Sequence, residues 1–111
     1  MLAYFEIIEE PTSDFRFNLV APDNIKLLAG EIFITKVSCQ YVIAAVKAHC
    51  SQIANFDISN GAPEENRFRL KAPNGMVLGV SDGYRDKTEL EEAILAVQKF
   101  APDAYVIDRS D

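Results

Sequence analysis

Three basic side chains alternate along one predicted strand: Arg67, Arg69 and Lys71. Because every second side chain of a strand points to the same face of its sheet, the three should form one outward row. Guanidinium and ammonium groups bind phosphates and carboxylates, so this basic row is a candidate contact surface for an anion. The alternative is a solvated face on which the cations pair with acidic residues of adjacent strands.

A second candidate is the apolar run Ile32, Phe33 and Ile34, which precedes the first predicted helix. If these side chains are exposed, they form a surface for a protein partner or for self-association. If they are buried, they add to the core or to an edge strand. The sequence leaves both alternatives open.

The remaining polar candidates favour structural roles over chemistry. His49 is the only histidine and lies at the margin of a helix stripe, which is typical of a packed or half-exposed ring. The helix dipole favours acidic residues at the start of a helix, which accounts for Glu89, Glu91 and Glu92. The loop and strand positions of Tyr84 and Tyr105 indicate packing roles. The sequence contains no phosphate-binding glycine loop, no Cys/His metal spacing and no second histidine for a triad. We therefore expect no enzyme, no metal and no cofactor.

Two cysteines, Cys39 and Cys50, lie on one predicted helix. Their separation along the axis is about 16 Å, whereas a disulfide needs Cα atoms within about 7 Å, so they cannot pair with each other there. Their spacing is close to three whole turns, which puts both on one face and predicts buried, inert thiols.

Composition predicts one acidic globular domain over residues 1–111. Of the 111 residues, 49% are hydrophobic and 25% are charged, and the net charge is −6. This balance is typical of a folded domain and disfavours nucleic acid and anionic membranes as partners. The N-terminus lacks the basic region of a signal peptide, and no stretch has the ~18–20 apolar residues of a membrane span. We expect a cytoplasmic location.

The chain aligns with itself without a gap when residue 16 is placed on residue 67. Identical pairs then include Phe5/Phe56, Ile7/Ile58, Arg16/Arg67, Phe17/Phe68, Leu19/Leu70, Pro22/Pro73, Lys36/Lys87, Ile43/Ile94 and Val46/Val97. We interpret this as two tandem repeats, residues 1–55 and residues 56–111, the second including a closing strand.

Each repeat is expected to contain three strands, one helix and a following strand. Alternating apolar residues, turn residues and helical stripes predict strands over 4–8, 15–21, 25–30, 56–59, 67–72, 76–81 and 105–108. The first helix is expected over 36–52, and the second is expected to start after Asp86, in a capping box with Glu89, and to stop at Pro102. Tight turns between strands favour an α+β fold of two tandem β3-α-β repeats, with one mostly antiparallel sheet and two helices on one face. The other face would be open to water or a partner.

The second half resembles the repeat of the YegP-like family of uncharacterised proteins. The resemblance lies in the hairpin from Arg67 to Gly75, the turn from Ser81 to Tyr84 and the helix that ends near Val97. It covers nearly the whole chain and is weaker in the first half, where Leu28 and the apolar run replace Gly79, Gly83, Tyr84 and Arg85. The resemblance implies a β3-α-β unit, present in tandem or as a dimer of single units, with exchanged C-terminal strands. It implies no activity.

These features together favour a non-enzymatic protein-interaction or regulatory module of uncharacterised function. The alternative is a small-molecule or anion-binding module that uses the basic row, for which Arg69→Glu should abolish binding with the fold intact. We expect a monomer, because a tandem pair contains both units in one chain, with a homodimer through the apolar run as the exception.

Overall fold

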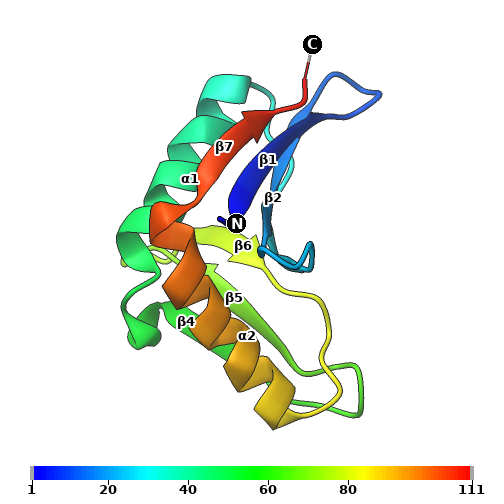
Figure 1. Ribbon diagram of the computed structural model, residues 1–111, viewed down its shortest axis with the longest axis vertical. Helices are drawn as coiled ribbons and strands as arrows, with labels where there is room; N and C mark the ends of the chain where they lie inside the picture. Colours follow the sequence, from blue (N-terminus) through cyan, green and yellow to red (C-terminus); the bar gives the residue numbers. More distant parts are fainter. Residues whose placement is uncertain (1, 111) are drawn as a thin grey trace.

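A computed structural model of the protein describes residues 2–110 and contains an α+β fold (Figure 1). The strands are β1 (Tyr4–Glu9), β2 (Phe15–Val20), β3 (Lys26–Ala29), β4 (Phe56–Ser59), β5 (Arg67–Lys71), β6 (Val77–Val80) and β7 (Tyr105–Asp108). The α-helices are α1 (Lys36–His49) and α2 (Lys87–Phe100), and short 3-10 helices η1 (Ile53–Asn55) and η2 (Ala101–Asp103) follow them.

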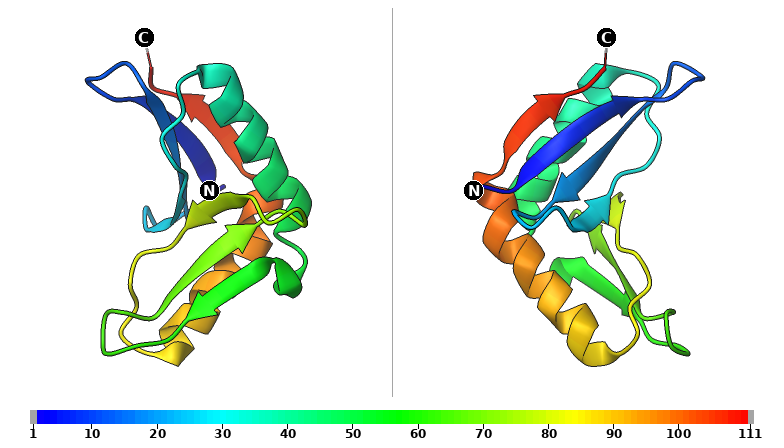
Figure 2. Two further views of the ribbon diagram at one scale, coloured as in Figure 1. Left: turned by 180° about the vertical axis from the view of Figure 1, so that it is seen from behind. Right: turned by 45° about the vertical axis from the view of Figure 1, so that its right-hand side comes forward.

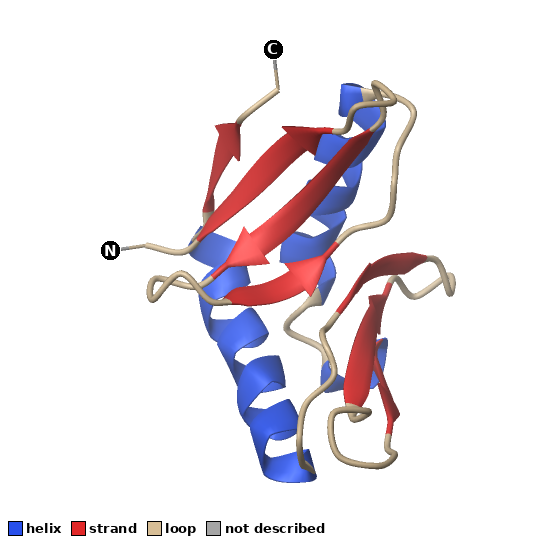
Figure 3. Ribbon diagram, turned by 90° about the vertical axis from the view of Figure 1, so that its right-hand side faces the viewer, coloured by secondary structure: helices blue, strands red, loops and turns tan. Residues whose placement is uncertain are grey.

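The strands form one sheet in the order β4-β5-β6-β3-β2-β1-β7. All neighbouring pairs are antiparallel except β1 and β7, which are parallel. Figure 3 shows both helices behind the strands, so they cover a single face of the sheet. The predicted α+β class and mostly antiparallel sheet are thus confirmed.

The two halves of the sheet meet at a narrow seam. β3 and β6 pair through one residue pair, Ala29 opposite Val80, whereas the hairpins on either side pair over several residues. Figure 2 shows that the two groups of strands diverge on either side of this seam. The helices bridge it, because α1 contacts β6 from the second half and α2 contacts β3 from the first.

Strand registers are the same in both halves. In the first half, Phe5 lies opposite Leu19 and Ile7 opposite Phe17, and in the second half Phe56 lies opposite Leu70 and Ile58 opposite Phe68. The ladder also shifts at matching places, between Leu19 and Val20 and between Leu70 and Lys71. Each residue pair between β4 and β5 therefore has a counterpart between β1 and β2.

Turns and caps follow the chemistry that the sequence indicates. Asn24 and Gly75 both adopt positive φ, 69° and 91°, which asparagine and glycine tolerate best. Asp86 accepts a hydrogen bond from the backbone N–H of Glu89 at 2.9 Å, and Thr35 does the same for Ser38 at 3.1 Å.

The predicted end of the first helix was wrong by three residues. α1 ends at His49, with Cys50 as its C-cap, and not at Gln52. The chain then turns, since the side chain of Asn55 donates to the carbonyl of His49 at 3.0 Å and η1 begins. The apolar periodicity gave no signal for this local bond.

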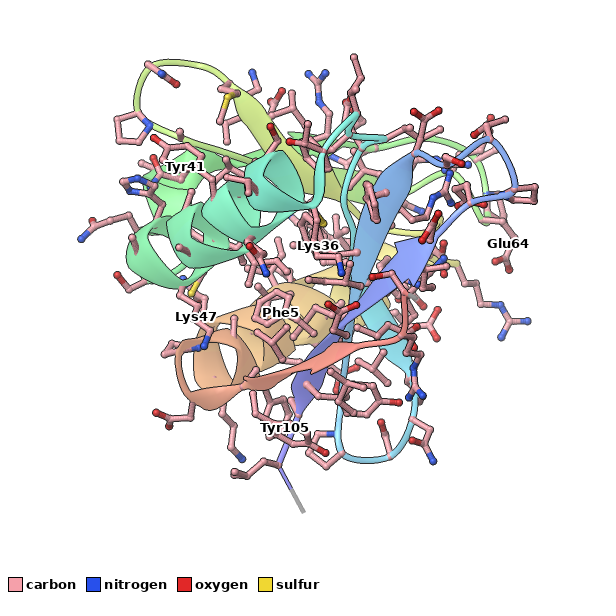
Figure 4. All side chains as sticks on the ribbon, turned by 90° about the horizontal axis from the view of Figure 1, so that it is seen from above. Phe5, Lys36, Tyr41, Lys47, Glu64 and Tyr105 are labelled. Atoms are coloured by element: carbon pink, nitrogen blue, oxygen red, sulfur yellow. The ribbon has the colours of Figure 1, made fainter. Side chains whose placement is uncertain are left out.

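The core lies between the sheet and the helices. It joins inward side chains of both halves into one buried cluster, of which the largest members are Phe5, Phe17, Phe68, Ile7, Leu19, Leu28, Leu70, Leu78 and Leu90. Phe5 lies between β1 and the helices in Figure 4. Within residues 2–110, no helix has the length and apolarity that a membrane crossing requires.

Candidate binding surfaces

The basic row lies on the open face of β5, as its alternation predicts. Arg69 Nη2 lies 2.6 Å from Asp57 Oδ2, and Lys71 Nζ lies 3.2 Å from the same oxygen. Asp57 belongs to β4, the neighbouring strand, and its hydrogen bond from Arg69, followed by that from Lys71, lowers the pKa of its carboxyl. Two of the three cations are therefore paired across strands, which was the alternative to an anion site.

Arg67 differs from its two neighbours. It is exposed and forms no ion pair within the described residues. Its side chain borders a shallow hollow of about 250 Å³ that is lined by Ser59, Arg67, Phe68, Arg69, Val80 and Ser81. Arg67 thus lines a small pocket and, unlike Arg69 and Lys71, has no carboxylate partner among the described residues.

The apolar run is divided between core and surface. Phe33 is half-buried: its backbone exchanges two hydrogen bonds of 2.7 Å with Phe15, and its ring stacks on Phe17 with centroids 6.4 Å apart. Ile32 and Ile34 point outward, and Ile34 is 83% exposed. Each of the two alternatives therefore holds for part of the run.

Ile34 is continuous with further exposed apolar side chains on the outer side of α1. Val37 and Tyr41 follow one and two turns later, and Tyr41 is 69% exposed and points away from the molecule in Figure 4. A groove of about 450 Å³ beside them is lined by Phe33, Val37, Ser38, Tyr41, Val42 and Met76. We call Ile34, Val37, Tyr41 and Met76 the α1 surface.

Three members of the α1 surface were not among the residues selected from the sequence. Val37 and Tyr41 are four residues apart, the spacing of one helix face, and this face does not coincide with the buried stripe. The four-residue spacing of Val37 and Tyr41 is the sequence signal that could have identified this exposed helix face. Met76, from the turn between β5 and β6, could be added only once the fold placed it beside α1.

Both cysteines are free and buried, as predicted. Burial raises the pKa of Cys39 to about 11 and also raises the pKa of Cys50. A raised pKa disfavours the thiolate, which is the reactive and metal-binding form of cysteine, at both positions.

The other polar candidates have structural surroundings. His49 is half-buried at the end of α1, and Glu89 accepts a hydrogen bond from the backbone N–H of Arg85 at 3.2 Å. Tyr84 pairs its backbone with Asn66, and Tyr105 packs on Tyr4 with ring centroids 5.8 Å apart. Within residues 2–110, no three His, Cys, Asp or Glu side chains are grouped so that they could hold a metal ion.

Comparison with known proteins finds relatives along the whole chain. Residues 63–108 match the family model described as a domain of unknown function, DUF1508. The chain is 31% identical to a UPF0339 protein in the ptx operon 5′ region of Stutzerimonas stutzeri over 97% of both chains, and 31% identical to UPF0339 protein YegP of Yersinia pestis over 88% of both.

Two solved structures share the fold of this chain. The solution NMR structure of yegP from E. coli, a protein of unknown function, superimposes with a TM-score of 0.91. It is 26% identical to this chain, and the match covers 100% of this chain and 97% of that one. A UPF0339 protein from Shewanella oneidensis, 21% identical and with a TM-score of 0.90, covers 97% of this chain and 92% of its own and shares the fold.

Proposed function

The chain belongs to the UPF0339 family of YegP-like proteins, and we propose that it is a non-enzymatic module that binds another protein through the α1 surface. One observation supports the proposal above all: Ile34, Val37 and Tyr41 form a continuous exposed apolar strip beside a groove. Relatives in the family are uncharacterised proteins of unknown function, so the proposal depends on this chain's own surface.

An exposed apolar strip is costly to leave in water. Burial of one such side chain contributes about 1.5–3 kcal/mol, so the strip offers several such contributions to a complex. Tyrosine is a frequent anchor of protein interfaces, because its ring is large and its hydroxyl can remain hydrated. Tyr41 is the natural centre of the proposed contact.

The architecture that we propose for the chain is a tandem pair of β3-α-β repeats, residues 1–55 and 56–111. The identical registers of β1·β2 and β4·β5 support this interpretation. Because both units belong to one chain, we propose that the protein is monomeric when no partner is bound. Buried, free thiols fit the reducing cytoplasm, which is the compartment we propose.

Site-specific photo-crosslinking in cells tests the proposed contact. A benzophenone amino acid in place of Tyr41 should form a crosslink to another protein, since it lies at the centre of the proposed interface. The same replacement at Tyr105, an exposed tyrosine on β7, is the matched control and should form none. Adding Ile34→Asp to the Tyr41 variant should remove the crosslink. No crosslink at position 41, or one that persists with Ile34→Asp, would contradict the proposal.

Anion binding is a second candidate function, and the guanidinium of Arg67, which has no carboxylate partner among the described residues, favours it. Ser59 lines the same hollow and its hydroxyl can donate to an anion, whereas the hydroxyl of Ser81 already donates to the carbonyl of Asp82 at 2.8 Å. Arg69 and Lys71 are partly neutralised by Asp57, so Arg67 is the stronger candidate of the row.

Titration of the protein with inorganic phosphate and citrate, followed by amide chemical shifts, tests this second candidate. Binding should shift the amides of β5 and disappear in Arg67→Glu, while Arg85→Glu, an exposed arginine in the loop before α2, should bind as the wild type does. Arg69→Glu, which the basic row predicts to abolish binding, belongs in the same series. Equal shifts in the wild type and in Arg67→Glu would exclude the site.

A further inference from the structure

The two halves of the sheet differ in whether a further strand covers their outer edge. β7 lies alongside β1 in parallel and covers its outer edge, whereas β4, which has the register of β1 in the second half, is the last strand on its side. Figure 2 shows β4, in green, at the border of the sheet with no strand beyond it. The consequence is visible at matched residues: Ile7 is 0% exposed, and its counterpart Ile58 is 40% exposed.

The backbone of Ile58 in β4 presents unused hydrogen-bonding groups at this edge, whereas the N–H of Phe56 already donates to the carbonyl of Ile53. On β1, the carbonyl of Ile7 accepts a hydrogen bond of 2.9 Å from the backbone N–H of Arg109, just after β7. Ile58 faces Phe68 as Ile7 faces Phe17, so its N–H and C=O must also point to the outer edge. There they have no strand of the described residues to pair with.

An apolar pocket lies beside the same edge. It has a volume of about 280 Å³, lies between β4 and α2, and is lined by Ile53, Ile58, Glu91, Ile94 and Leu95. Leu95 is 64% exposed. Four of the five lining residues are aliphatic, so the pocket suits an apolar side chain of a strand that pairs with β4.

The unpaired charge of Lys87 indicates which residue type should occupy a second position of such a strand. In the first half, Lys36 at the start of α1 forms an ion pair of 2.9 Å with Asp108 of β7. Its counterpart at the start of α2 is Lys87, which is exposed and forms no ion pair with any described residue. If the added strand carries an acidic residue two positions after its apolar residue, that acid would form an ion pair with Lys87, as Asp108 does with Lys36.

We propose that the outer edge of β4 binds an extended segment of another protein as a parallel strand, with an apolar residue opposite Phe56 and an acidic residue opposite Ile58. The contact of β7 with β1 is the template, because Val106 lies opposite Phe5 and Asp108 opposite Ile7. Such strand addition combines backbone hydrogen bonds with pockets for alternate side chains. This edge is separate from the α1 surface.

A second copy of the chain fits this edge less well. Antiparallel pairing of two β4 strands would bring only Phe56 and Ile58 towards the pocket, and no acid to Lys87, since Asp57 points to the open face and is held by Arg69 and Lys71. The β7 of another copy has the right pattern, but it is already paired with its own β1. The proposed occupant is therefore a partner's segment.

A synthetic peptide with the sequence of residues 103–110, blocked at both ends and carrying a fluorophore, is the probe. Added to the full chain, it should raise fluorescence anisotropy and shift the amides of β4 and α2. Ile58→Lys puts a charge into the pocket and should weaken binding at least about tenfold. Lys87→Glu should weaken it about fivefold, the upper range of an exposed ion pair. A peptide with lysine in place of Asp108 should then prefer the Lys87→Glu protein over the wild type.

Matched variants distinguish binding at this edge from binding elsewhere on the molecule. Lys99→Glu makes the same charge change near the other end of α2 and should leave peptide affinity unchanged, and circular dichroism should show that all variants stay folded. Three results would overturn the proposal: no binding at millimolar peptide, shifts confined to β1 and α1, or a homodimer that Ile58→Lys separates. The last would identify a second copy as the occupant.

Discussion

At the residue scale, Leu28 and Gly79 hold matching positions on β3 and β6 but are opposite in size. A Cβ built on Gly79 would lie 2.7 Å from Cγ of Leu28, closer than real Cβ atoms approach. The missing side chain of one half thus makes room for the leucine of the other, beside the narrow seam between β3 and β6. This exchange of a large residue for glycine explains why the two halves differ there.

We expect Gly79→Ala to destabilise the protein by about 1–3 kcal/mol, the usual range for overpacking. Leu28→Ala alone should cost about 2–5 kcal/mol, because it leaves a cavity. Since the new methyl group would occupy part of that cavity, the double variant should lose less than the sum of the two. Urea unfolding of the four proteins measures this coupling. Strict additivity would mean that the two residues do not compete for one space.

Asp108 connects β7 to α1, and its titration should be visible in stability. Hydrogen bonds from Ser110, the leading cause, and from Lys36 lower the pKa of this carboxyl from 3.8 to about 2. A pKa that is lower in the folded state contributes stability above pH 3.8, and this contribution is lost as the pH falls through about 2. We expect Asp108→Asn to be less stable than the wild type at pH 6, with the difference vanishing near pH 2. Urea midpoints across this range provide the measurement, and a constant difference would contradict the pKa assignment.

At the element scale, local chemistry predicted which segments form strands and helices, and tertiary contacts determined the rest. Alternation identified β5, and the apolar stripe with its Asp86 cap identified α2. The end of α1 depends on the bond from Asn55 to His49, which has no periodic signature. The pairing of β7 with β1 joins the two ends of the chain, and no local pattern specifies such a long-range neighbour.

The candidate sites were predictable to the extent that they depend on one strand or one turn. The outward direction of Arg67, Arg69 and Lys71 follows from alternation alone. That Asp57 pairs with only two of them follows from the register of β4 against β5, which alternation does not determine. The pocket beside Ile58 became apparent only when the edge positions of the strands were known.

The start of α2 offers a test of one local signal. Asp86 accepts from the N–H of Glu89 and also places a negative charge near the positive end of the helix. We expect Asp86→Ala to cost about 1 kcal/mol of unfolding free energy, within the usual range for caps, and Asp86→Ser to cost less. Thermal or urea unfolding measures both. Equal stability of the alanine variant and the wild type would show that the cap bond is replaced by water without loss.

At the scale of the whole molecule, the apolar strip on α1 belongs to a chain with a net charge of −6. Like charges repel between copies, whereas the apolar strip attracts, so the balance decides between a monomer and a homodimer. One chain already supplies both halves of the sheet. We therefore expect the wild type to be a monomer whose α1 surface is free for a different protein.

Light scattering on the wild type and on Ile32→Asp/Ile34→Asp measures this balance. Both side chains are exposed, so the charged variant should keep the circular dichroism spectrum of the wild type. We expect a monomer mass for both proteins at about 0.1 M salt. The wild type should also remain a monomer at about 1 M salt, where the Debye length is near 3 Å and most charge repulsion between copies is screened. A wild-type dimer at either salt concentration that the variant separates while folded would instead make the α1 surface a contact between copies. The search for a partner would then begin at the outer edge of β4.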